Sequence, residues 1–119
     1  MPSGRTTLAG SLAARGTAYR SLTRYDEALR DLDRAVSIRR RLVEKEGRRD
    51  LANWLAGTLS SRGDVLSWMA RYADALADYD RAVDLRTALV EQEGHAEWAD
   101  DPGRKLGRSW HRLPVPDPL

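Results

Sequence analysis

The chain has no cysteine among its 119 residues. Without thiols it can form no disulfide bond, no thiolate metal site and no cysteine nucleophile, which fits a reducing compartment such as the cytoplasm. Phenylalanine is also absent, and only two of the 20 basic residues are lysines. Together with many alanine, glycine and aspartate residues, this preference for arginine indicates a GC-rich bacterial coding sequence. We therefore expect a bacterial, cytoplasmic protein.

Long apolar runs are missing too. No stretch approaches the roughly 20 residues that a helix needs to cross a bilayer, and residues 1–7 lack the apolar core of a signal peptide. Basic and acidic residues nearly cancel, which leaves a net charge of +2. The arginine clusters at 39–41 and 48–49 are flanked by acidic residues, as on a solvated helix face. We therefore expect neither a membrane nor a nucleic acid as a partner.

What the chain does contain is a duplication. The segment Arg24–Gly47 returns as Arg71–Gly94, 47 positions later, and the likeness begins upstream at Leu8 and Leu55. Residues 8–47 and 55–94 are identical at 21 of 40 positions. A fixed period of this size indicates stacked repeats, in which each unit buries against its neighbour an apolar face that it cannot bury alone.

Apolar and small residues spaced by three or four positions predict two helices in each repeat. In the first repeat, about residues 5–47, we expect helices over 5–22 and 25–46, with Thr23 capping the second helix and Gly47 ending it. The residues expected to face inward are Leu8, Leu12, Gly16, Tyr19, Leu22, Tyr25, Ala28, Leu29, Leu32, Ala35, Val36, Leu42 and Val43.

The second repeat, about residues 50–94, follows the same pattern. We expect helices over 51–69 and 72–93, with Asp50 capping the first and Gly94 ending the second. The residues expected to face inward are Leu51, Leu55, Leu59, Gly63, Leu66, Met69, Tyr72, Ala75, Leu76, Tyr79, Ala82, Val83, Leu89 and Val90.

A degenerate third copy comes next. Residues 102–113 keep Leu106 and Leu113 at equivalent apolar positions, and Pro102 suits the first turn of a helix. We expect a short capping helix there, which would complete one domain over residues 1–113. The proline-rich tail over 114–119 is expected to be extended and flexible.

Small residues occupy fixed places in both hairpins. In the first helices glycine follows a large apolar residue after four positions, as Leu12 with Gly16 and Leu59 with Gly63. The second helices carry aromatic, large and small residues at matching places: Tyr25, Ala28, Leu32 and Ala35, then Tyr72, Ala75, Tyr79 and Ala82. This pattern resembles the tetratricopeptide repeat.

The resemblance implies an all-α fold of antiparallel helical hairpins, stacked as a short right-handed superhelix of two full repeats and a truncated third first helix. The period of 47 residues exceeds the family's usual value of about 34, so we expect longer helices. The sequence also places arginine where the family has an apolar residue, at Arg15 and Arg62. These side chains either pair with aspartates on the second helix, Asp31 or Asp33 and Asp78 or Asp80, or extend to solvent.

For function, the resemblance implies a non-enzymatic module that binds a partner peptide or helix in a concave groove lined by the first helices. By motif position the groove residues are Gly10, Ala13, Thr17, Arg20, Ser21, Gly57, Ser60, Asp64, Ser67 and Trp68. The expected partner-binding residues among them are Ala13, Thr17, Arg20, Ser60, Asp64, Ser67 and Trp68. The lysine and asparagine residues with which some family members clamp a terminal carboxylate are missing.

Tryptophan is the natural anchor for such a partner, because a few large aromatic side chains dominate interface energies. Trp68 is our first candidate, with the alternative that its ring packs on the neighbouring helix. Trp54 is open to the same two interpretations. Trp98 and Trp110 are expected to cap the stack.

We expect no catalytic residue, no cofactor and no metal site. His95 and His111 have no neighbouring nucleophile arrangement and no metal-ligand spacing. Asp31 and Asp33 lie two positions apart, so on a helix they point in different directions and cannot converge on one ion.

Self-association is the alternative function. Two full repeats and a remnant fall short of the three or so that a stack usually needs. An uncovered apolar face would then pair with a second copy of the chain.

Overall fold

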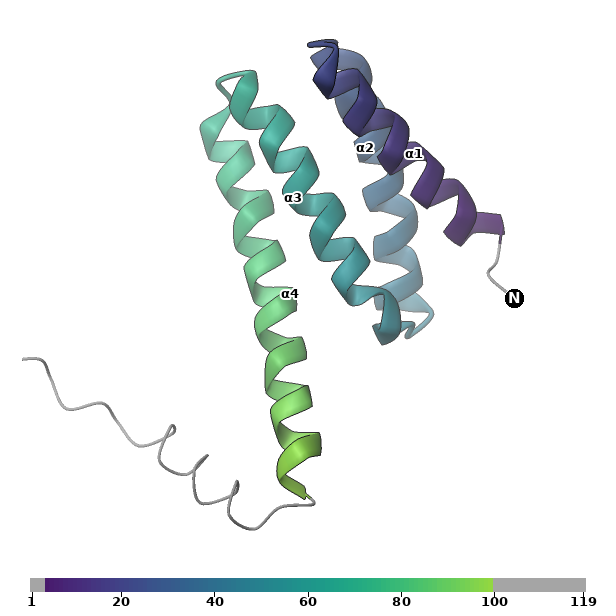
Figure 1. Ribbon diagram of the computed structural model, residues 1–119, viewed down its shortest axis with the longest axis vertical. Helices are drawn as coiled ribbons and strands as arrows, with labels where there is room; N and C mark the ends of the chain where they lie inside the picture. Colours follow the sequence, from purple (N-terminus) through teal and green to yellow (C-terminus); the bar gives the residue numbers. More distant parts are fainter. Residues whose placement is uncertain (1–3, 100–119) are drawn as a thin grey trace, which may run out of the picture. The chain divides into compact units, whose positions relative to one another are not determined.

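The computed structural model describes residues 4–99, with side chains as far as residue 92. Regular structure in this range is all helical, which confirms the expected all-α class: α1 spans Gly4–Ser21, α2 Tyr25–Arg40, α3 Ala52–Trp68 and α4 Tyr72–Ala99 (Figure 1). The chain divides within α4 into two compact units, the first ending at Thr87 and the second beginning at Ala88. In the second unit the structure describes the remaining turns of α4.

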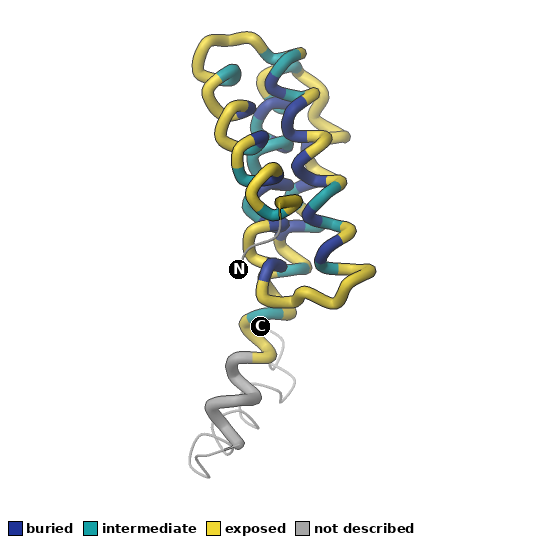
Figure 2. The backbone as a smooth tube through the Cα atoms, turned by 90° about the vertical axis from the view of Figure 1, so that its right-hand side faces the viewer, coloured by how far each residue is buried: buried dark blue, intermediate teal, exposed yellow. Residues whose placement is uncertain are grey.

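Within the first unit the two hairpins stack side by side, because α1 packs against α2 and α2 against α3 (Figure 1). The seam between the repeats is apolar: Val36 of α2 lies in one buried cluster with Leu55 and Leu59 of α3 and Ala82 of α4. Buried positions recur along the helices of this unit (Figure 2). Stacked hairpins of this kind are what the duplication predicts.

The turns inside the two hairpins share a left-handed residue. Thr23 and Ala70 occupy equivalent positions and have φ angles of 59° and 61°. In the first turn the Arg24 amide donates to the Tyr19 carbonyl at 2.9 Å, which closes the end of α1. The Thr23 hydroxyl donates to the Leu22 carbonyl, and no side chain caps α2. The expected Thr23 cap is therefore wrong, because the Thr23 hydroxyl bonds to the carbonyl of the preceding residue and not to an amide of α2.

The connection between the repeats is also helical. A π-helical turn, η1 (Arg41–Lys45), continues α2, and a 3₁₀ turn, η2 (Arg49–Leu51), leads into α3. Gly47 lies between them with φ 69° and ends the helix as expected. Asp50 does not cap α3, because its carboxylate instead accepts hydrogen bonds from Arg48 at 3.0 and 3.1 Å. That prediction is wrong.

The second long helix runs further than expected. α4 continues through Gly94, so the predicted helix end there is wrong. Glycine tolerates both helical and left-handed backbone, and a glycine that stays in the helical conformation does not end the helix. The expected capping helix over 102–113, the tail over 114–119 and the side chains of Trp98 and Trp110 lie outside the described residues.

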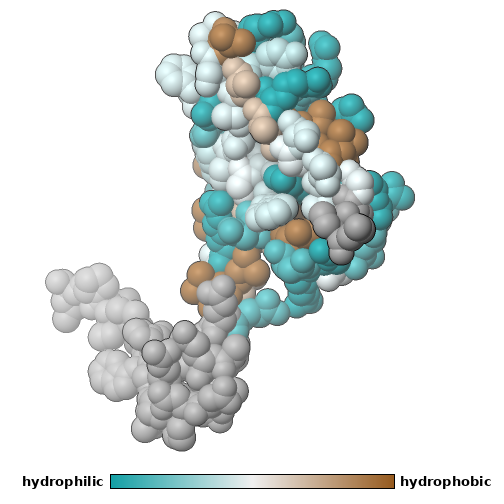
Figure 3. Space-filling view, turned by 45° about the vertical axis from the view of Figure 1, so that its right-hand side comes forward, coloured by the Kyte–Doolittle hydropathy of each residue, from teal (hydrophilic) through white to brown (hydrophobic). Residues whose placement is uncertain are grey.

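Equivalent residues of the two repeats differ in burial. Val36 is 2% exposed because it packs on α3, whereas Val83, its counterpart on α4, is 60% exposed. The other residues that were expected inside and are exposed are Leu8, Leu22, Tyr72, Leu76 and Val90. Those inward-facing predictions are wrong, because a repeat pattern cannot tell an inner repeat from a terminal one. Apolar and hydrophilic side chains accordingly share the surface (Figure 3).

Candidate functional site

In each hairpin one glycine of the first helix, Gly16 or Gly63, lets the two helices approach closely. A Cβ atom on Gly16 would lie 2.9 Å from Leu32 Cγ, and one on Gly63 would lie 2.8 Å from Tyr79 Cε1. Both distances are well below van der Waals contact, so a side chain at either position would force the packed helices to shift. This close packing fixes which side chains of α1 and α3 reach the surface.

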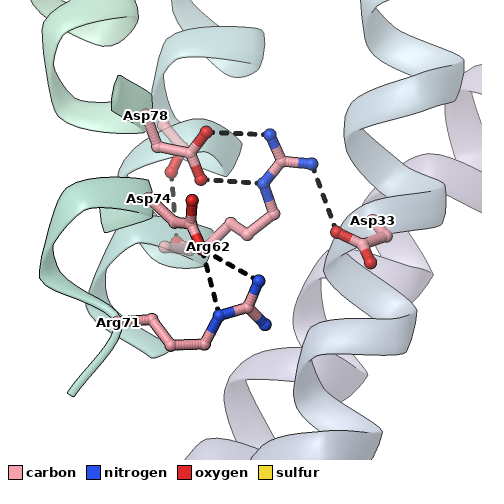
Figure 4. A network of polar contacts seen from close by, with 7 residues as sticks. Asp33, Arg62, Arg71, Asp74 and Asp78 are labelled. Carbon is pink, nitrogen blue, oxygen red and sulfur yellow. Dashed lines mark hydrogen bonds and ion pairs between the residues drawn. The ribbon is translucent and has the colours of Figure 1, made fainter. Parts of the chain in front are cut away.

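Arginine–aspartate pairs join neighbouring helices, and we call the lines along which these helices meet the helix seams. Arg62 Nε and Nη2 each donate to the Asp78 carboxylate at 2.8 Å, and Nη1 donates to Asp33 of the preceding repeat at 3.2 Å (Figure 4). In the first repeat Arg15 donates to Asp31 at 2.7 and 2.8 Å. Of the two alternatives that the sequence left open, the seam pair is therefore the one that forms. The Arg15 guanidinium holds the pKa of the buried Asp31 carboxyl below its ordinary value.

Arg62, Asp33 and Asp78 line a hollow of about 310 Å³ between α2, α3 and α4, which we call the paired-charge hollow. Its lining residues are Leu29, Asp33, Arg62, Leu66, Arg71, Asp74, Ala77 and Asp78. Arg71 pairs with Asp74 at 2.9 Å, so both arginines of the hollow have carboxylate partners. Because its charges are already satisfied, this hollow offers little to a charged ligand.

A wider hollow of about 560 Å³ opens between the two first helices, and we call it the α1–α3 groove. Its lining residues are Gly10, Ala13, Arg39, Asn53, Trp54, Gly57, Thr58, Ser61 and Arg86. Apart from Trp54 and the two arginines, these side chains are small or short. The groove is therefore open, with one large aromatic side chain that is 52% exposed.

Arg39 of α2 is buried at this groove, with only 9% of its surface exposed. Nη1 donates to the Thr58 hydroxyl and, at 3.4 Å, to the Trp54 carbonyl, and the guanidinium lies 5.4 Å from the centre of the Trp54 ring. Its Nε is buried without a hydrogen-bond partner. Desolvation lowers the pKa of Arg39 from its usual value. Arg39 forms no ion pair with any residue that the structure describes.

Arg86 is the counterpart of Arg39 in the second repeat. It is exposed and donates from Nε to Asn53 Oδ1 at 3.3 Å. Each of the two guanidiniums lies over a glycine of its own repeat: Nη2 of Arg39 is 3.6 Å from a Cβ built on Gly10, and Nη2 of Arg86 is 3.6 Å from one built on Gly57. Arg86 likewise has no acidic partner among residues 4–92.

The sequence-predicted binding residues do not gather in one place. Ala13 lines the α1–α3 groove, as do Gly10 and Gly57 of the wider motif set. Thr17 is exposed, and its hydroxyl donates to the Ala13 carbonyl at 3.0 Å. Ser60 and Ser67 are half-buried outside the groove lining.

Three further predicted residues lie elsewhere on these helices. Arg20 donates to Asp64 at 3.1 Å across the seam, so the two bind each other. The Tyr79 hydroxyl also donates to Asp64, which raises the pKa of Tyr79 to about 12. Trp68 is 69% exposed and does not line the groove, so the alternative that it packs on a neighbouring helix is wrong.

The sequence did not predict Arg39 and Arg86 as groove residues. Groove residues were expected only on the first helices, and Arg39 was expected on a solvated helix face. One signal was present. In the run at 39–41 only the first arginine returns after one period, since Thr87 and Ala88 replace the other two. Of these three arginines, only the one that reaches the groove has a counterpart in the second repeat.

The part of the chain that the structure describes contains neither a metal-ligand cluster nor a membrane-spanning helix. Among the described residues, no group of three or more histidine or acidic side chains could hold a metal ion. None of the helices in this part of the chain is both long and apolar enough to span a membrane.

Stacked helical hairpins with an open groove between their first helices define a helical-repeat protein. A tetratricopeptide repeat family model matches residues 8–48 and 55–97, which is more than half of the chain. The chain therefore belongs to the tetratricopeptide repeat family, and the resemblance seen in the sequence is confirmed. Repeats of this family generally mediate protein–protein interaction. No curated protein and no solved structure matches the chain.

Proposed function

We propose that this chain is a non-enzymatic interaction module that binds a segment of a partner protein in the α1–α3 groove. The observation that carries the proposal is the half-exposed Trp54 ring beside an open hollow of about 560 Å³. A large aromatic side chain at the edge of a concave surface is the usual anchor of a protein interface. The cysteine-free composition supports a reducing, cytoplasmic setting for this interaction.

Two tryptophans of α3 make a matched test. Trp54 lines the groove, whereas Trp68 is 69% exposed on the same helix outside it. Peptides selected on the purified chain from a random display library should lose about tenfold or more in affinity for Trp54→Ala. The same peptides should bind Trp68→Ala as they bind the parent. The groove assignment fails if no peptide is selected, or if Trp68→Ala is the variant that loses binding.

Self-association is a second candidate, supported by a different surface. Tyr72, Leu76 and Val83 are each exposed on α4 within the first unit, and their spacings of four and seven positions place them in one stripe along that helix. Val36, the counterpart of Val83, packs into the buried cluster on α3. Binding of a second copy of the chain at this stripe would remove its apolar side chains from water.

Light scattering over a range of concentrations tests this candidate. A dimer should form at micromolar concentrations and should dissociate in the Val83→Glu variant. Ser37→Glu is the matched control, since Ser37 is exposed on α2 and its counterpart, Asp84, is already acidic. A chain that stays monomeric at every concentration leaves the groove as the interaction surface and removes this candidate.

A further inference from the structure

The two hollows of the first unit differ in charge. In the paired-charge hollow, Arg62 and Arg71 face three aspartates and bond to them. The α1–α3 groove also has two arginines, Arg39 and Arg86, but none of its lining residues is acidic. A chain of nearly balanced charge therefore keeps two unpaired cations together in one groove.

The lack of an acidic partner among residues 4–92 destabilises the fold most at Arg39, because this arginine is buried. A buried cation is unfavourable unless an opposite charge compensates it, and the lowered pKa of Arg39 reflects this desolvation. The Thr58 hydroxyl and the Trp54 carbonyl accept its bonds, but both are neutral. In addition, Arg39 Nε is a buried hydrogen-bond donor without an acceptor, which also costs free energy. An anion that entered the groove would supply the missing charge.

The groove, with a volume of about 560 Å³, leaves room for such an anion beside the two arginines. Gly10 and Gly57 underlie the two guanidiniums, so no side chain separates the helix backbones from Nη2 of Arg39 or Arg86. Asn53 adds a neutral polar group beside Arg86. The Trp54 ring supplies an apolar surface next to the cations. The groove thus places two cations without acidic partners among the described residues beside an exposed aromatic ring.

We propose that the α1–α3 groove binds an acidic segment of a partner protein, in which carboxylates meet Arg39 and Arg86 and an adjacent apolar side chain packs on Trp54. This inference rests on the groove function proposed above. Arginine binds carboxylates through charge-assisted hydrogen bonds, often in pairs. Since the two arginines belong to successive repeats and line one groove, the segment should carry two carboxylates spaced so that each one reaches one guanidinium.

The charge distribution favours a peptide over a nucleic acid. A nucleic-acid strand would need a continuous row of free cations. Among the arginines of α1 and α3, however, Arg20 is paired with Asp64 and Arg62 with Asp33 and Asp78. Only a local cluster of carboxylates matches two isolated guanidiniums.

Two peptide display libraries test the proposal on the full chain. In the first library two glutamates are fixed at spacings of two to seven residues around a random apolar position, and in the second glutamines replace them. The first library should yield binders, and the second should yield none of comparable affinity. Arg86→Gln, which alters an exposed side chain, should weaken the selected peptides about tenfold. Arg30→Gln, which removes an exposed arginine of α2 outside the groove, should leave them unchanged.

Each contrary outcome has a distinct meaning. If the glutamine library binds equally well and Trp54→Ala abolishes its binding, the groove function stands and the acidic specificity is wrong. If neither library yields a binder, both proposals fail. If inorganic phosphate or a single-stranded oligonucleotide binds more tightly than the acidic peptides, the assignment to a peptide is wrong. Arg86→Glu adds a positive control, because it should reverse the preference toward lysine-bearing peptides.

Discussion

Arg62 donates a hydrogen bond to Asp33 across the boundary between the two repeats, at 3.2 Å (Figure 4). The same guanidinium also holds Asp78 of its own repeat at 2.8 Å. One side chain of α3 therefore ties α2 to α4. Arg20 and Arg81 also cross this boundary, to Asp64 and Glu44. Arginine suits such places because its planar fork can bond to two acceptors at once, which gives the arginine-rich composition a structural role.

The first prediction concerns this ion network. Asp78 is 7% exposed, so Arg62→Met would leave a buried carboxylate without its partner. We expect the free energy of unfolding to fall by about 2–4 kcal/mol. Asp33→Asn should cost less than about 1 kcal/mol, because the Asp33 side chain is 55% exposed. Urea titrations followed by circular dichroism measure both values. Equal losses for the two variants would contradict the unequal burial of the two carboxylates.

The second prediction concerns acid stability. Arg15 lowers the pKa of Asp31 in the folded chain below its ordinary value of 3.8. Between the folded and unfolded pKa values the unfolded state binds more protons, so stability rises with pH there. The contribution of Asp31 is thus complete above about pH 4–5 and is lost as the pH falls through the folded pKa. Urea titrations from acid to neutral pH should show a flatter acid limb for Asp31→Asn. An acid limb identical to that of the parent would exclude Asp31 as a contributor.

The third prediction concerns the glycine notches. A Cβ on Gly63 would lie 2.8 Å from the Tyr79 ring, and the hydrogen bond from Tyr79 to Asp64 hinders the ring from moving aside. Gly63→Ala should therefore destabilise the chain by about 1–3 kcal/mol. At Gly57 the nearest atom is 3.6 Å away, so Gly57→Ala should be neutral, or stabilising by about 0.5–1 kcal/mol through its better helix propensity. Thermal or urea unfolding compares the pair. A stable Gly63→Ala variant would show that the ring can repack.

The duplication allowed much of the fold to be derived from sequence. It predicted the four helices of the described residues and the stacking of the hairpins, and it gave the Arg15 and Arg62 seam pairs as one of two alternatives, because these depend on contacts inside a repeat or between two copies. It failed where a residue's surroundings depend on its place in the stack. Val36 and Val83 occupy the same repeat position, yet only Val36 has a neighbouring hairpin over it.

The repeat pattern also did not predict local backbone features such as helix caps and helix ends. Thr23 and Asp50 were both expected to cap helices, but the Thr23 hydroxyl bonds to the Leu22 carbonyl and the Asp50 carboxylate accepts from Arg48. Gly47 and Gly94 are equivalent, and only Gly47 adopts the left-handed conformation. The groove arginines were missed because groove residues were expected on the first helices alone, whereas the long side chains of Arg39 and Arg86 reach the surface of α1 and α3.

The last prediction separates the role of Arg39 in binding from any role in folding. Methionine is unbranched and apolar, so Arg39→Met fills much of the same space and removes a buried cation that lacks an acidic partner among the described residues. The Thr58 hydroxyl stays satisfied, because it donates to the Trp54 carbonyl at 2.8 Å. We therefore expect the free energy of unfolding to stay unchanged or to rise, in contrast to Arg62→Met. The same urea titrations measure it. A loss of more than about 1 kcal/mol would show that the bonds of Arg39 to α3 hold the repeats together, and its charge would then need no ligand to explain it.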